Sequence, residues 1–191
     1  MKNSINSKGI ILVSVLILFA AFTRLIPHPF GFTAVGAMAL FGSAVFNKKV
    51  LAFFVPIFTM WFSDIIINNF INGTESFALF YSYQIYTLLP MALIVLFGMF
   101  FFNKITPAKI LGGSLASALI FFIVSNFGAW TSVYALFPKT FMGLMETYVA
   151  GLPFLRNDLA GTIFFSTLLF GAHYLLTLKF PSFKLAKEKI K

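Results

Sequence analysis

The stretch RLIPHPFGFTAVGAMALFGSAVFNKK, residues 24–49, decides how the rest of the chain is interpreted. It begins with an arginine, two prolines and a histidine, continues through a helix-length run rich in Ala, Gly and Ser, and ends at two lysines. Proline removes a backbone donor, so Pro27 and Pro29 predict a turn. The spacing of Ala39 and Ser43 permits neighbouring helices to approach closely. Tight internal packing explains this run, and a docking face for another membrane subunit is the alternative.

The composition around this stretch is that of a membrane protein. The chain is 60% hydrophobic and 10% charged, whereas soluble proteins average about a quarter charged residues. The absence of cysteine excludes disulfides and thiolate metal sites, and no cofactor or metal is predicted. The net charge of +9 lies mostly between apolar stretches, where it orients the chain in a membrane, so nucleic acid is not an expected partner.

Six apolar segments predict the fold. A helix needs about 20 residues to cross the ~30 Å hydrocarbon core. Proline, glycine and charged residues divide the chain into candidate helices at 9–26, 30–47, 50–68, 83–102, 110–130 and 159–178. The predicted fold class is therefore all-α: a polytopic membrane helix bundle of about six transmembrane helices. We expect a single integral membrane domain, residues 1–191, with a basic cytoplasmic tail at 179–191.

The basic residues predict the orientation of this bundle. Six passes with an inside N-terminus leave only Arg24, Lys139 and Arg156 on the outer side, out of 14 basic residues. The other basic residues are Lys2, Lys8, Lys48, Lys49, Lys104, Lys109, Lys179, Lys184, Lys187, Lys189 and Lys191. Because cytoplasmic loops carry the excess of Lys and Arg, both termini are expected inside, in a bacterial cytoplasmic membrane.

The longest predicted connection, residues 131–158, is neither polar enough for a free loop nor apolar enough for a clean span. Phe141, Leu144, Met145 and Tyr148 are spaced by three and four residues, which predicts an amphipathic helix on the outer surface. This helix would form a lid, or it would simply pack over the bundle. The Asn157-Asp158 pair that follows predicts the N-cap of the last helix.

Several polar residues have similar predicted depths in the membrane. At a rise of 1.5 Å per residue, Arg24, Asp64 and Asn126 each lie roughly 21–24 Å from the cytoplasmic ends of their helices. A carboxylate at that depth normally faces protein, water or a partner charge, and Arg24 is the expected partner of Asp64. The pair either ties the first and third helices together or contributes to a ligand site.

The depth pattern yields a set of candidate substrate-binding residues at the outer ends of the helices. Trp and Tyr would supply aromatic walls and the polar residues a few orienting contacts. The tryptophans are equally consistent with an interfacial belt, and Arg156 with lipid headgroups. The set is Asp64, Trp61, Asn68, Asn126, Trp130, Arg156 and Arg24.

Longer runs carry a resemblance to known families. FTAVGAMALFGSAVFNKKVLAFFVPIFTMWFSDIIIN, ILGGSLASALIFFIVSNFGAW, YVAGLPFLRNDLAGTIFFSTLLFG and RLIPHPFGF together resemble a bacterial family of uncharacterised small integral membrane proteins. More distantly, the small-residue helix, short basic turn and apolar helix ending at Asp64 resemble the S-components of energy-coupling-factor (ECF) vitamin transporters. This resemblance implies six helices and a substrate pocket that opens outward.

One feature departs from the S-component pattern. S-components use small residues on their first helix to contact a coupling subunit, whereas this first helix offers only Ser14, Ala20 and Ala21 among large aliphatic residues. A membrane coupling subunit is therefore a possible partner rather than an implied one, and a solitary carrier is the alternative.

Three kinds of function are considered, and a membrane enzyme is the least expected of them. The leading hypothesis is a membrane solute-binding or transport protein that takes a small vitamin-like molecule in an outward-facing pocket. A structural or assembly subunit is the alternative, and it would be favoured if Phe side chains filled the outer cavity. The chain is not predicted to be an enzyme, because it lacks HExxH, a Gly-rich phosphate loop and GxSxG.

Overall fold

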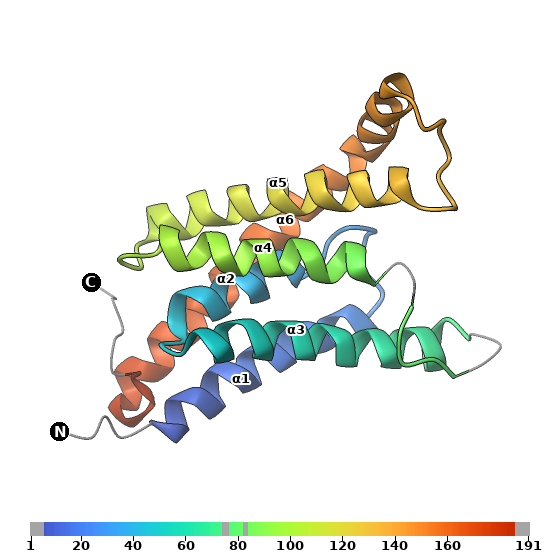
Figure 1. Cartoon of the computed structure of the whole chain (residues 1–191). Coiled ribbons are helices and arrows are strands. Elements are labelled where there is room, and N and C mark those ends of the chain that lie inside the picture. The colour runs from blue at the N-terminus through green and yellow to red at the C-terminus, as the bar shows by residue number, and fades with distance from the viewer. Residues whose placement is uncertain (1–5, 74–76, 82–83, 186–191) are drawn as a thin grey trace.

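The computed structural model describes residues 6–73, 77–81 and 84–185, which form helices, turns and loops without a β-strand (Figure 1). The α-helices are α1 (Ser7–Phe22), α2 (Val35–Val45), α3 (Lys49–Ile66), α4 (Ile85–Phe101), α5 (Pro107–Thr131) and α6 (Phe141–Lys179). A 3-10 turn, η1 (Thr23–Leu25), extends α1, a π-helical segment, η2 (Ile67–Ile71), extends α3, and a 3-10 turn, η3 (Pro181–Phe183), follows α6. The all-α prediction is confirmed.

Four helical segments are long and apolar enough to cross a membrane, and they establish a helical membrane protein. They are Ser7–Leu25, Lys49–Ile71, Pro107–Thr131 and Phe141–Lys179. The apolar helix α4 has 17 residues, a length of roughly 25 Å. The exposed side chains of α3 include Phe54, Phe58 and Phe62, as expected for a surface in contact with lipid.

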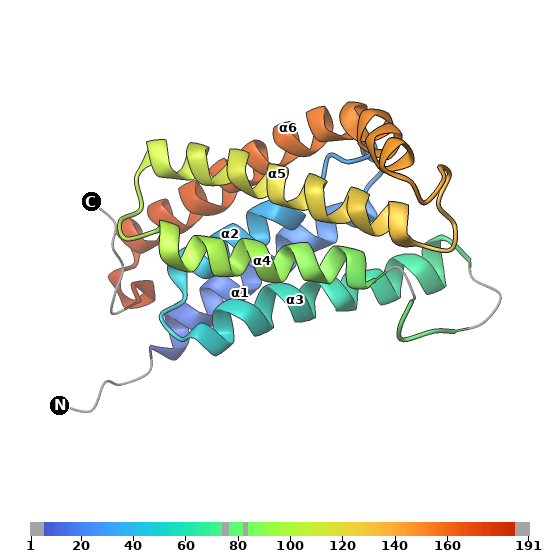
Figure 2. The same ribbon diagram turned by 45° about the horizontal axis from the view of Figure 1, so that its top comes forward.

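Helix α2 lies in the centre of the bundle, with the other five α-helices around it (Figures 1 and 2). Residues 35–43 are buried on every side. Gly36 faces Thr162 of α6, and Gly42 faces Pro56 of α3. Small side chains therefore let one helix pack against five neighbours. The tight-packing interpretation is confirmed, and the alternative of an external docking face is wrong because these residues are not at the surface.

The second predicted helix, 30–47, is too long. Helix α2 has 11 residues, which span roughly 16 Å and cannot cross the ~30 Å hydrocarbon core. The chain reaches it through a turn in which Gly31 has a φ of +86°. A Cβ atom at Gly31 would lie 3.1 Å from the Phe154 carbonyl of α6, so both backbone conformation and space favour glycine here.

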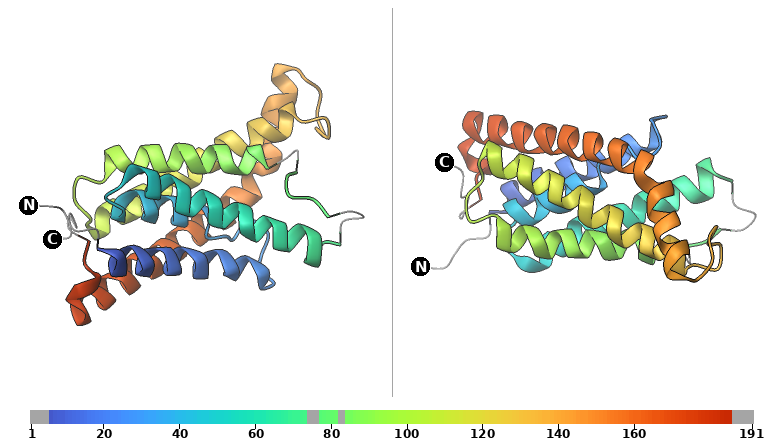
Figure 3. Two further views of the ribbon diagram at one scale, coloured as in Figure 1. Left: turned by 60° about the horizontal axis from the view of Figure 1, so that its bottom comes forward. Right: turned by 90° about the horizontal axis from the view of Figure 1, so that it is seen from above.

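The last predicted helix, 159–178, begins much earlier in the structure. Helix α6 runs without interruption from Phe141 and has Pro153 in its interior. Its first three turns bend away from the bundle axis and lie across the end of α5 (Figure 3), and proline is the usual cause of such a bend. The helix predicted within 131–158 is therefore present as the first part of α6. The N-cap predicted at Asn157-Asp158 is wrong, because both residues lie inside α6.

Both described ends of the chain lie at the same end of the bundle. The side-chain amide of Asn6, before α1, donates to the carbonyl oxygens of Ser182 and Lys184 at 2.9 and 2.7 Å. The turns between α2 and α3 and between α4 and α5 are also at this end (Figure 1). Residues 186–191 of the predicted basic tail lie outside the described residues.

Candidate functional site

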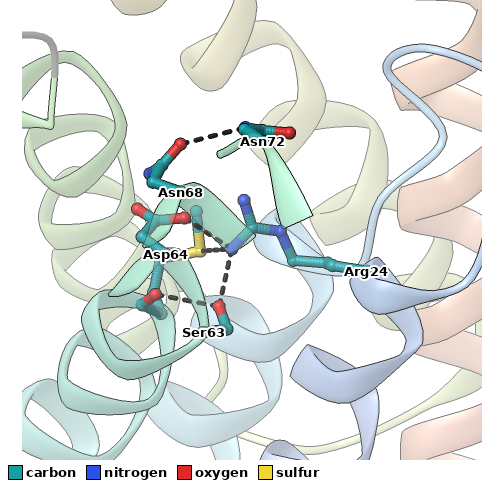
Figure 4. Close-up of polar contacts among 6 residues, drawn as sticks. Arg24, Ser63, Asp64, Asn68 and Asn72 are labelled. Atoms are coloured by element: carbon teal, nitrogen blue, oxygen red, sulfur yellow. Dashed lines mark hydrogen bonds and ion pairs between the residues drawn. The ribbon is translucent and has the colours of Figure 1, made fainter. Parts of the chain in front are cut away.

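An ion pair joins α1 to α3 near the opposite end of the bundle. Arg24 Nη1 lies 2.8 Å from Asp64 Oδ1, with 15% and 7% of the two side chains exposed. The same nitrogen donates to Ser63 Oγ at 2.7 Å and to Met60 Sδ at 2.9 Å (Figure 4). The pairing of Arg24 with Asp64 expected from their depths is thus present in the structure.

The π-helical segment η2 adds amide groups beside this ion pair. A π-turn places one extra residue in the helix and is frequent at functional sites. Its Asn68 is buried, and Asn68 Oδ1 accepts a 3.1 Å hydrogen bond from Asn72 Nδ2. Figure 4 shows these two side chains alongside Arg24 and Asp64. Asp64 and Asn68 therefore lie on the side of this helix that faces Arg24.

A cavity of about 1100 Å³ opens beside these groups. Its walls come from the end of α1 and the following loop, the end of α3, the start of α4, the last part of α5 and the middle of α6. Arg24, Asn72, Ser125 and Asn126 contribute polar groups to the lining. The aromatic lining residues are Phe30, Tyr86, Phe121, Phe122, Tyr134 and Phe154. The cavity is thus largely apolar, with a few polar groups from separate helices.

Asp158 of α6 is a further acidic residue of the cavity wall. The residue is 7% exposed, and Thr162 Oγ1 donates to its Oδ1 at 3.4 Å. Its Oδ2 is buried without a hydrogen-bond partner. Asn157, the preceding residue, donates to the Phe30 carbonyl at 2.8 Å and so holds the loop after α1 against α6. Asp158 is thus the acidic group that α6 contributes to the cavity lining.

The first part of α6 packs against the end of α5 that lines the cavity. Tyr148 donates from its hydroxyl to the Ile123 carbonyl of α5 at 2.9 Å, and its ring packs on Phe122. A Cβ atom at Gly151 would collide with the side-chain oxygen of Asn126, so only glycine permits this close approach. Asn126 itself donates to the Phe122 carbonyl at 2.8 Å, and it is therefore held between α5 and α6.

Three of the candidate residues lie away from this cavity. Trp61 donates to the Leu79 carbonyl at 3.0 Å and lines a separate apolar groove with Phe58 and Phe80. Trp130 donates to the Pro138 carbonyl at 2.9 Å and fixes the loop between α5 and α6. Arg156 is exposed. Of the predicted set, Arg24 and Asn126 line the cavity, while Asp64 and Asn68 support it from behind.

Sequence reasoning overlooked Asp158 as a site residue because it treated the residue as a helix cap at the membrane boundary. A usable signal was present. Asp158, Thr162 and Ser166 follow at intervals of four, so they share one face of a helix, and all three are buried in the structure. No cluster of three His, Cys, Asp or Glu side chains suited to a metal ion occurs among the described residues.

Comparison with known proteins places the chain in a family without assigning it an activity. No curated protein and no solved structure shows significant similarity to the chain. One family of unknown function, DUF6580, matches residues 4–183, which is nearly the whole chain. This extent of match supports the resemblance to a family of uncharacterised membrane proteins. The chain is therefore a member of the DUF6580 family.

Proposed function

We propose that this protein is a membrane solute-binding or transport protein that receives a small vitamin-like molecule in the cavity between α1, α3, α4, α5 and α6. The observation that carries the proposal is the cavity itself, about 1100 Å³ in volume, mostly apolar and supplied with polar groups from several helices. Small-molecule sites have this makeup and roughly this size, with volumes of about 300–1,000 Å³.

The alternative function, a structural or assembly subunit, was expected to show an outer cavity filled by Phe side chains. Phe121, Phe122 and Phe154 are lining residues here and leave the volume open. This arrangement favours solute binding. Helix α1 offers few small residues on which a coupling subunit could dock. Ala20 and Ala21 are buried, while the exposed residues include Ile11, Val15 and Phe19. We therefore propose an S-component-like solute binder whose coupling partner, where present, does not dock on small residues of α1.

Filling the cavity is expected to abolish solute binding. Ser125 lines the cavity, so Ser125→Trp places a large side chain in it. Leu119→Trp is the matched control, because Leu119 is on the same helix, 46% exposed and absent from the cavity lining. We expect small molecules that co-purify with the wild type to remain with Leu119→Trp and to fall at least tenfold with Ser125→Trp. Mass spectrometry of the purified proteins measures this difference.

Two results of the cavity-filling experiment would contradict the proposed function. If Ser125→Trp folds with unchanged helicity and keeps the same co-purified molecules as Leu119→Trp, the cavity is not the binding site and the proposal fails. A wild-type protein free of co-purified molecules, and unresponsive in binding assays to vitamin-like compounds, would also count against it.

We further propose that the cavity opens to the outer side of a bacterial cytoplasmic membrane. Arg24, Lys139 and Arg156 are the basic residues near the cavity end. The described basic residues at the other end of the bundle are Lys8, Lys48, Lys49, Lys104, Lys109, Lys179 and Lys184. Because cytoplasmic loops carry the excess of Lys and Arg, the second group is assigned to the cytoplasm.

Cysteine labelling tests this orientation without removal of native thiols, since the chain has no cysteine. Val133, 92% exposed, lies in the loop between α5 and α6, and Lys184 lies after α6. In intact cells, a membrane-impermeant maleimide is expected to label Val133→Cys and to leave Lys184→Cys unlabelled until the cells are permeabilised. The reverse pattern would place the cavity on the cytoplasmic side.

A further inference from the structure

Asp158 lines the cavity and has a side-chain oxygen that is left without a hydrogen-bond partner. The side chain is more than nine-tenths buried, yet its Oδ2 has no protein partner, and its Oδ1 holds only the long contact to Thr162. Burying a carboxylate without compensation is costly, and acidic residues within membrane segments therefore pair with a charge or mark a substrate path. Because Asp158 lines the cavity, a molecule bound there would lie next to its carboxyl group.

The charges of the cavity wall do not cancel. Arg24 is committed to Asp64 at 2.8 Å, so its positive charge is already matched. No ion pair joins Asp158 to another residue within 6–73, 77–81 and 84–185. The start of α2 at Val35 also lines the cavity, and a helix N-terminus contributes about half a positive charge. That partial charge helps to hold a carboxylate there without pairing with it, so a cationic ligand would complete the pairing.

The rest of the lining sets the shape of a complementary molecule. Aromatic side chains Tyr86, Phe122 and Phe154 suit an apolar or aromatic body, and their ring faces also attract a cation. A bare metal ion fits poorly, because the described residues provide no cluster of metal-binding side chains and the cavity is far larger than an ion. An anion would meet the unpaired carboxylate.

We propose that Asp158 binds the protonated amine of a small organic cation whose apolar or aromatic body lies against the cavity walls. This inference rests on the proposed function and specifies its substrate class. The Asp158 carboxylate accepts a hydrogen bond from the ammonium group, and Asn126 and Asn72 contact polar atoms elsewhere on the molecule. A charge-assisted bond of this kind is roughly twice as strong as a neutral one, so the amine dominates recognition.

Matched pairs of probes test the inference. Tryptamine and tyramine each carry a cationic amine on an aromatic body, and their N-acetyl derivatives are neutral. We expect wild-type protein in lipid nanodiscs to bind each amine at least tenfold more tightly than its N-acetyl derivative, by isothermal titration calorimetry. Asp158→Asn is expected to weaken amine binding at least tenfold and to leave the weak binding of the neutral probes unchanged. Glu146→Gln, at an exposed acid of the same helix, is the control and should match the wild type.

The outcomes separate this inference from the proposed function. Equal binding of both members of each pair, abolished by Ser125→Trp, would keep the cavity as a site and overturn the amine assignment. Unchanged amine binding in Asp158→Asn would do the same, and so would a wild type that binds neither probe. Binding that survives Ser125→Trp would overturn the proposed function itself. Asp158→Glu, which retains the charge, should keep the preference for amines, and unchanged binding of the neutral probes would show that the Asn variant is folded.

Discussion

Replacing Asp64 by Ala is expected to lower the free energy of unfolding by about 3–5 kcal/mol, because it leaves the Arg24 guanidinium buried without its counter-charge. Arg24→Ala is expected to have a similar cost, since it leaves the Asp64 carboxylate unpaired in a segment that crosses the membrane. The double variant Arg24→Ala/Asp64→Ala should lose less than the sum of the two single losses. The basis is the 2.8 Å contact between side chains that are 15% and 7% exposed.

Unfolding in mixed micelles of increasing SDS content, followed by circular dichroism, measures the three free energies. Glu146→Gln is the control at an exposed charge and should change stability by less than about 0.5 kcal/mol. Additive single losses would contradict the interpretation, because a pair in direct contact has an interaction energy that additivity excludes. They would show that Arg24 is held by Ser63 and Met60 instead of by Asp64.

The sequence was sufficient for most of the long helices. The bounds predicted for α3, α4 and α5 lie within three residues of those observed, since a turn with lysines marks one end of each helix. The Arg24–Asp64 pair was also predictable, because a rise of 1.5 Å per residue gives depth directly. The direction in which a side chain points was harder to predict. Trp61 and Asp64 are three residues apart, yet Trp61 contacts Leu79 while Asp64 turns inward to Arg24.

There is a physical reason why the sequence did not predict the residues at which α2 and α6 begin. Residues 30–34 are nearly as apolar as a helix, so composition does not separate this loop from a membrane helix. Pro153 suggested a break, but α6 continues through it with a bend. Both errors affect the cavity. Because α2 begins only at Val35, the loop before it lines the cavity, and α6 lines the cavity only from Phe154 onward.

The contact between α2 and α4 gives the second large expected effect. Gly98 of α4 is buried against Ser43 of α2, and a Cβ atom at Gly98 would overlap the Ser43 hydroxyl and lie 2.9 Å from Ser43 Cβ. Because α2 is enclosed on all sides, it has no free direction in which to move. Gly98→Leu is therefore expected to destabilise the protein by about 3 kcal/mol or more through overpacking. Unfolding in mixed micelles of SDS and a mild detergent measures the loss.

Gly112→Leu is the matched control, since it adds the same atoms to a neighbouring helix. A Cβ atom at Gly112 meets only Phe101 Cζ, at an ordinary 3.7 Å. Leucine is also favoured over glycine inside a helix by up to about 1 kcal/mol, so this variant should be as stable as the wild type or more stable. Equal stability of the two variants would mean that α2 and α4 separate easily. The central position of α2, and with it the space that its short length leaves for the cavity, would then need another explanation.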